Sequence, residues 1–188
     1  MKHHLNYSAA ILKKLAVLPL FLLVFQFTNA QLAVVKMVGK NADKTKLGFG
    51  AFSYYDIPLN EDGNRSFRIE LLDLAFFSRK TDEDPSWAYL SIKLGYKYIF
   101  SETKTGFYIE PQAGYCRVVS VEKDAPEAEH GDGIAVALEA GYSLEVGERG
   151  NAFNFGLKYE TDRAGSAYTI SSVGFRVSYS FNLFRRRE

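Results

Sequence analysis

The stretch that decides the fold is SVGFRVSYSFNLF, residues 172–184. From Val173 onward, apolar and aromatic side chains occupy every second position, and mostly small or polar side chains lie between them. A period of two is typical of a β-strand whose two faces meet different surroundings. When tilted, a strand of about 11 residues covers roughly the ~25 Å apolar band of an outer-membrane barrel. The stretch therefore predicts a membrane-spanning strand.

The N-terminus has the pattern of a secretory signal peptide. Basic residues precede an apolar run, residues 15–27, and the sequence TNA at residues 28–30 supplies a small-residue cleavage site. The apolar run is shorter than the ~20 residues that a membrane-spanning helix needs. We expect residues 1–30 to be removed, which leaves residues 31–188 as one outer-membrane β-barrel domain.

Composition narrows the class of protein. Three of the 23 Lys and Arg residues and none of the 22 Asp and Glu residues lie in the leader, so the mature net charge is 20 − 22 = −2. We therefore expect no nucleic-acid partner. Cys116 is the sole cysteine, which excludes an internal disulfide. We expect no cofactor and no bound metal.

Seven further segments alternate in the same way, although Lys36 interrupts the first. They are residues 32–38, 46–55, 66–78, 87–100, 107–121, 133–146 and 151–161. With residues 172–184 they predict an all-β fold, a single eight-stranded antiparallel transmembrane β-barrel.

The third segment changes phase along its length. Phe67, Ile69 and Leu71 alternate with charged residues, but Asp73 then falls on the apolar face. A β-bulge near Leu72 would restore the phase.

The connections between the segments agree with such a barrel. If the first strand rises from the periplasm, the outer connections are residues 39–45, 79–86, 122–132 and 162–167, and the periplasmic ones are residues 56–65, 101–106 and 147–150. Barrels of this kind have longer outer loops, and the longest connection, residues 122–132, falls outside. Aromatic residues predict girdles at the two interfaces, with Trp87 and Tyr89 at the outer one and Phe107 and Tyr179 at the inner one.

A soluble barrel with its faces inverted is the rival fold, because periodicity alone does not say which face points inward. Between its charges the polar face is rich in Gly, Ala and Ser, which suits a cramped interior. We therefore expect the apolar face to meet lipid.

Several motifs resemble those of the outer-membrane β-barrel domain family, small eight-stranded proteins of OmpA and OmpX type architecture with PorT-like members. The motifs are GFG at residues 48–50, LGYKY at 94–98, YIEPQAGY at 108–115, EAGY at 139–142 and GFRVSYSF at 174–181. The resemblance implies an integral outer-membrane protein without an assigned reaction. The chain departs from many barrels by ending in RRRE, residues 185–188.

Ten charged residues fall on the face assigned to the interior. They are Arg68, Glu70, Lys93, Lys97, Glu110, Glu139, Glu145, Lys158, Glu160 and Arg176. Five are basic and five acidic, so they can pair as a polar plug in an interior that side chains fill. The same residues could instead line a narrow ion path or a small-ligand pocket, and the sequence does not separate these interpretations.

A lipid-modifying outer-membrane enzyme is the remaining alternative, because some eight-stranded barrels transfer or remove acyl chains of lipid A, which needs a general base beside a hydroxyl nucleophile. His130 is the sole histidine after the leader, with Asp132 two residues on and Ser120 ten residues before. This spacing matches no established catalytic motif, so we expect a solvated acidic loop and no enzymatic activity. Asp124, Glu127 and Glu129 lack the ligand spacing of an EF-hand.

The sequence therefore predicts an outer-membrane barrel with an envelope-structural or surface-interaction role. Its expected partners are outer-membrane lipid and a surface or periplasmic protein bound through loops. The sequence specifies neither that protein nor the oligomeric state.

Overall fold

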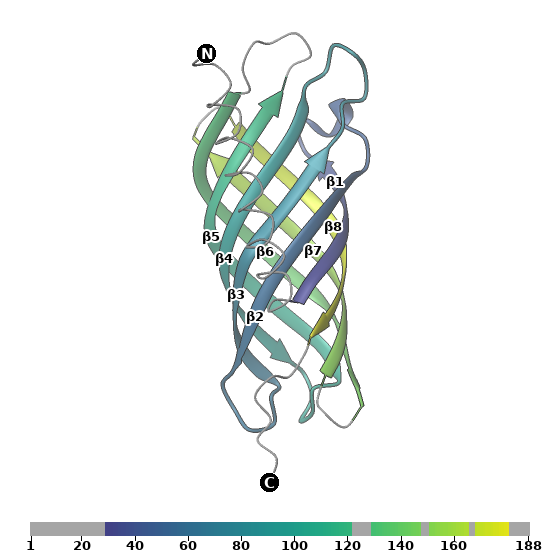
Figure 1. The fold of residues 1–188 in the computed structure, drawn as a ribbon, viewed down its shortest axis with the longest axis vertical. Coiled ribbons are helices and arrows are strands. Elements are labelled where there is room, and N and C mark those ends of the chain that lie inside the picture. Colours follow the sequence, from purple (N-terminus) through teal and green to yellow (C-terminus); the bar gives the residue numbers. More distant parts are fainter. Residues whose placement is uncertain (1–28, 122–128, 148–150, 166–167, 181–188) are drawn as a thin grey trace, which may run out of the picture.

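In a computed structural model of the chain, the structure describes residues 29–121, 129–147, 151–165 and 168–180. These residues form eight strands: β1 (Asn29–Val38), β2 (Gly48–Pro58), β3 (Arg65–Phe77), β4 (Ser86–Ile99), β5 (Gly106–Val121), β6 (Glu129–Val146), β7 (Asn151–Ala164) and β8 (Tyr168–Ser180). Each strand pairs antiparallel with the next, and β8 pairs with β1, so the sheet closes into a barrel (Figure 1). The predicted fold is confirmed.

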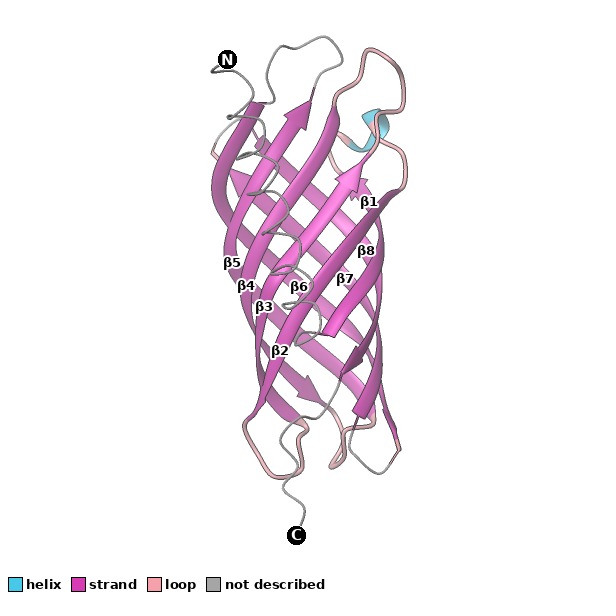
Figure 2. Cartoon of the chain, viewed as in Figure 1, coloured by secondary structure: helices cyan, strands magenta, loops and turns pink. Residues whose placement is uncertain are grey.

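The barrel has two unlike ends (Figure 2). We call the end that carries residues 39–47 and 78–85 the outer end, and the end that carries residues 59–64 and 100–105 the inner end. A short 3-10 helix, η1 (Ala42–Lys44), lies in the first outer connection. Within the described residues, no helix is long and apolar enough to cross a bilayer.

Side chains alternate between the outside and the inside of the barrel. On β6, Leu138 is 48% exposed and its neighbour Glu139 is 3% exposed. On β4, Leu94 is 51% exposed whereas Lys93 is completely buried. An apolar outer surface around a charged interior is the arrangement of a membrane barrel. The soluble barrel with inverted faces is therefore wrong.

A β-bulge in β3 produces the change of phase seen in the sequence. Glu70 pairs with Lys93 and Asp73 pairs with Ser91, so β3 has one more residue than β4 between these two pairs. The register with β2 shifts at the same place. Because both Leu71 and the residue after it face away from the interior, Asp73 returns to the inside. The predicted bulge is confirmed.

Several strand ends differ from the prediction. β1 begins at Asn29, and β6 begins at Glu129 within the expected outer loop. The predicted end of the last strand, residues 181–184, lies outside the described residues. Residues 1–28 also lie outside them. The signal peptide and the domain boundary after residue 30 remain predictions.

The outer girdle was assigned to the wrong side of the sheet. Trp87 and Tyr89 are 7% and 3% exposed and lie inside the barrel. Both lie an even number of positions from the inward-facing Lys93, so alternation along β4 places their side chains on the inside as well. With residues from other strands they form an apolar cluster in the outer half of the interior, which we call the apolar plug: Met37, Phe77, Trp87, Tyr89, Val118 and Ile170.

Candidate functional site

The structure buries nine of the ten predicted interior charges. The tenth, Glu145, lies near the inner end of β6, where its side chain is exposed. Its backbone N–H donates to the Thr105 hydroxyl at 2.9 Å. Alternation along β6 predicted that Glu145 faces inward like Glu139, but Glu145 lies beyond the enclosed part of the barrel. Glu145 is therefore not part of the network, and its assignment was wrong.

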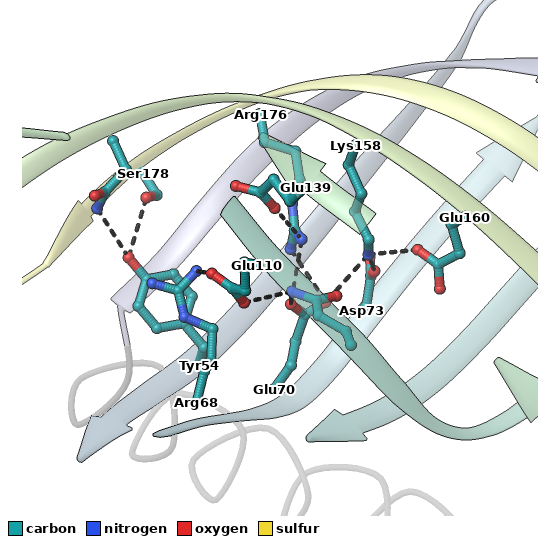
Figure 3. A network of polar contacts seen from close by, with 12 residues as sticks. Tyr54, Arg68, Glu70, Asp73, Glu110, Glu139, Lys158, Glu160, Arg176 and Ser178 are labelled. Atoms are coloured by element: carbon teal, nitrogen blue, oxygen red, sulfur yellow. Dashed lines mark hydrogen bonds and ion pairs between the residues drawn. The ribbon is translucent and has the colours of Figure 1, made fainter. Parts of the chain in front are cut away.

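Two lysines from different strands, Lys93 and Lys158, form the centre of the network. Figure 3 shows Lys158 with its partners Asp73 and Glu160. Lys93 Nζ lies 2.6 Å from Asp73 Oδ2 and 2.5 Å from Glu160 Oε1. Lys158, which lies on β7, binds the same two carboxylates, those of Asp73 and Glu160. Sharing both acids between both lysines neutralises the four charges, which is how buried charges persist.

Arg176 connects this centre to the inner half of the barrel. Its guanidinium makes two hydrogen bonds to Glu70, at 3.1 and 3.2 Å, and one to Glu139 at 3.0 Å. The guanidinium carbon lies 3.3 Å from the centroid of the Phe52 ring, a cation–π contact. Strands β2, β3, β6 and β8 therefore meet at one side chain.

Arg68 repeats this arrangement nearer the inner end. It makes a two-bond ion pair with Asp56, at 2.7 and 2.9 Å, and its Nη1 lies 2.9 Å from Glu110 Oε2. Its guanidinium carbon lies 3.6 Å from the centroid of the Tyr54 ring. Arginine suits such sites because its planar fork binds carboxylates and also stacks on aromatic faces.

Gly156 makes room for the hydrogen bond between Tyr108 and Glu139. The Tyr108 hydroxyl donates to Glu139 Oε1 at 2.5 Å. A Cβ atom at Gly156 would lie 2.6 Å from that hydroxyl and 2.5 Å from the same carboxylate oxygen. Any larger residue at Gly156 would therefore displace this hydrogen bond.

Lys97 differs from the other buried cations. Its ammonium donates to Asn154 Oδ1 at 2.5 Å and lies 4.3 Å from the centroid of the Tyr108 ring. Within the part of the chain that the structure describes, no carboxylate lies within ion-pair distance of it, whereas the other four buried cations each have at least one. Its charge is therefore held by neutral groups.

Three acidic residues of the interior were missing from the predicted set. The β3 bulge brings in Asp73, and Asp56 and Asp162 were assigned to connections but belong to β2 and β7. The change of phase at Asp73 was the signal that could have identified the first. With Asp56 partly exposed and Glu145 outside the network, five buried cations face six buried acids among the described residues, so the predicted five-against-five balance is wrong.

Asp162 is the acid that the buried cations do not neutralise. It is completely buried, and neither of its carboxylate oxygens has a hydrogen-bond partner among the described residues. Asp162 therefore stands between the charge network and the apolar plug.

The structure separates the three residues considered for catalysis. His130 is exposed, whereas Ser120 on the neighbouring strand is buried and faces the interior. Asp132 forms a two-bond ion pair with Arg117, at 2.6 and 2.9 Å. His130 and Asp132 lie in β6, not in the expected loop. A nucleophile and its base must lie within hydrogen-bond reach. Ser120 faces the interior and His130 faces the outside, so they cannot act together.

No set of three candidate metal ligands comes together among the described residues. Asp124 and Glu127 of the predicted acidic loop lie outside them. Glu129 accepts a hydrogen bond from the Tyr168 hydroxyl at 2.6 Å. Glu129 and Asp132 are therefore both held by hydrogen bonds to protein side chains.

The charged side chains of the described interior pack closely against one another. A cavity beside Asp73, Lys158 and Arg176 measures only about 10 Å³, which is room for about one water molecule. Above it lies the apolar plug, so charged and apolar side chains fill successive levels of the interior. These features define the class of protein: an eight-stranded transmembrane β-barrel with an occluded interior.

Comparison with solved structures supports that class. Neisserial surface protein A (NspA) is similar with a TM-score of 0.63 and 14% identity, over 81% of this chain and 93% of that one. Ail, the attachment invasion locus protein of Yersinia pestis, is similar with a TM-score of 0.50 and 16% identity, over 81% of this chain and 95% of that one. At these identities the likeness concerns the fold, and it agrees with the predicted small-barrel architecture of OmpA and OmpX type.

No protein-family model matches the chain, and the comparison with curated proteins finds no relative. The PorT-like relationship stays a prediction.

Proposed function

We propose that this chain is an integral outer-membrane protein with a non-enzymatic envelope-structural or surface-interaction role. The apolar outer surface of the barrel supports insertion into lipid, and the signal-peptide pattern at residues 1–30 supports export. Its longer connections would then face outward and the inner end would face the periplasm.

The observation that carries the proposal is the filled interior. A conducting barrel needs an aqueous path from end to end, but here the charge network spans the middle and the apolar plug follows it. The parts left to meet a partner are the connections at the outer end.

Two of these connections are held together as one surface. The Lys46 N–H donates to the Ser78 carbonyl at 2.9 Å, and the Lys80 N–H donates to the Lys44 carbonyl at 2.9 Å. Thr81 closes the tip of the second connection, because its hydroxyl donates to the Asp84 carboxylate at 2.6 Å and lowers the pKa of Asp84. A preorganised surface of this kind loses less entropy when it binds a partner.

Location and orientation can be tested with single cysteines in a Cys116→Ser background. In intact cells, a membrane-impermeant maleimide should label Thr81→Cys in the outer connection but should label Asp62→Cys in the inner turn only after the cells are opened. Recovery of the protein in the soluble fraction without detergent, or equal labelling of both positions, would contradict the proposal.

The kind of role can be tested in two further assays. The purified protein should show no steady conductance in planar bilayers, and ion-selective currents that change in a Lys93→Gln variant would favour transport instead. In a deletion strain, a barrel whose residues 79–84 are replaced by Gly and Ser should insert normally. Failure of that barrel to restore the wild-type phenotype would identify a surface-interaction role, and full restoration would identify a structural one.

A further inference from the structure

A cavity opens at the inner end of the barrel and has a volume of about 100 Å³. Its lining comes from strands and turns far apart in the sequence, and includes Asp56, Ser66, Lys97, Lys104, Ser143 and Asn154. We propose that this inner cavity binds a small oxyanion of the phosphate or sulfate class, with the Lys97 ammonium as its main partner.

Lys97 has unused hydrogen-bonding capacity. An ammonium group has three N–H donors, and within the described residues Asn154 is the sole acceptor that the Lys97 ammonium reaches. Lys97 is only 5% exposed, so bulk water replaces a missing partner poorly. A buried cation without an anionic partner is costly, and an oxyanion in the cavity would supply that partner.

The remaining charges of the lining favour an anion. Among the described residues that line the cavity, Asp56 is the one carboxylate, and Arg68 neutralises it through two hydrogen bonds. Lys104 adds a second positive charge from the turn between β4 and β5. Its stem passes over Gly63, where a Cβ atom would lie 2.4 Å from Lys104 Cε. Gly63 therefore leaves room for the Lys104 side chain, and both residues line the cavity.

The volume limits the size of the ligand. A cavity needs about 10–15 Å³ to hold one water molecule, so the inner cavity holds several waters or one polyatomic ion. Drug-sized ligands occupy pockets of about 300–1,000 Å³. The cavity therefore suits an inorganic oxyanion or a single phosphate group, and the hydroxyls of Ser66 and Ser143 can donate to its oxygens.

The test is a calorimetric titration of inorganic phosphate into the folded full-length protein in zwitterionic detergent, with ionic strength balanced by chloride. The wild-type protein should bind phosphate saturably. Lys97→Gln should weaken binding at least tenfold and Lys104→Gln by a smaller factor. The control Lys80→Gln, which removes an exposed charge at the outer end, should leave binding unchanged.

Absence of saturable binding by the wild-type protein would overturn the proposal, as would equal affinities of the Lys97→Gln, Lys104→Gln and Lys80→Gln variants. If Lys97→Gln does not fold, Lys104→Gln decides the question, because Lys104 lies in a turn. The titration is carried out first in a detergent that has no phosphate group and then in phosphatidylcholine bilayers, which add lipid phosphate groups without a net surface charge. Weaker binding in the bilayers would identify a lipid phosphate as the competing ligand, and unchanged binding would identify a soluble anion.

Discussion

Arg176 on β8 and Glu70 on β3 form a two-bond ion pair across the interior of the barrel, with N–O distances of 3.1 and 3.2 Å, although they are 106 positions apart in the sequence. The two strands are not neighbours in the sheet. The pair therefore links opposite parts of the wall directly, in addition to the backbone hydrogen bonds between adjacent strands. Glu70 also lies 3.3 Å from Lys93, so the pair is part of the central network.

Removing Arg176 should strongly destabilise the barrel. Arg176→Met leaves Glu70 and Glu139 without a main partner in a buried site, and breaking a buried ion pair costs about 3–5 kcal/mol. Denaturant unfolding of the protein in lipid vesicles measures this loss. The control is Arg117→Met, which breaks an exposed ion pair with Asp132 and should change stability little. Equal effects of the two variants would show that Arg176 has no special role.

A charged residue introduced on the outward surface should destabilise the barrel by an amount that depends on its depth in the bilayer. Leu138 lies midway along β6 and faces outward, so Leu138→Arg should cost about 2–4 kcal/mol if that position lies near the bilayer midplane. Phe107, at the inner end of β5, is 70% exposed, and Phe107→Arg should cost about 0–1 kcal/mol. Unfolding free energies in lipid measure both. A larger cost at Phe107 would mean that the apolar belt is misplaced.

Deleting Leu72 should be tolerated. The β3 bulge contains one extra residue, so its removal leaves Glu70 opposite Lys93 and brings Asp73 opposite Ser91 in regular pairing. The inward and outward sides of β3 then stay unchanged. Heat-dependent mobility on gels should show a folded barrel for this variant. Deleting Ile69, in a regular part of β3, is the matched control, because it turns one part of the strand inside out. Failure of the Leu72 deletion to fold would show that the bulge itself is required.

His130→Ala should leave folding, insertion and the lipid A profile unchanged. His130 is exposed, and Arg117 holds the neighbouring Asp132, so His130 lacks the oriented carboxylate and the nearby hydroxyl that acyl-transfer chemistry needs. Mass spectrometry of lipid A from cells with the wild-type gene, the variant and no gene measures this. A difference in acyl chains that depends on His130 would contradict the non-enzymatic assignment.

The sequence by itself determined the fold and most of the interior. Alternation along residues 133–146 assigned Leu138 to the outside and Glu139 to the inside, and the structure agrees. This worked because a strand turns successive side chains to opposite faces, so parity is a local property of the chain. The same reasoning located the bulge, since Asp73 conflicts with the phase of the residues before it.

Only the tertiary structure decided how deep each inward residue lies and which residue it meets. Glu145 has the inward parity of Glu139 but passes beyond the enclosed space, whereas Asp162, expected in a loop, is fully buried. The partners of Lys93 and Arg176 come from strands distant in the sequence. Alternation carries no information on strand stagger or on contacts across the barrel, because both are set when the sheet closes and all eight registers are fixed together.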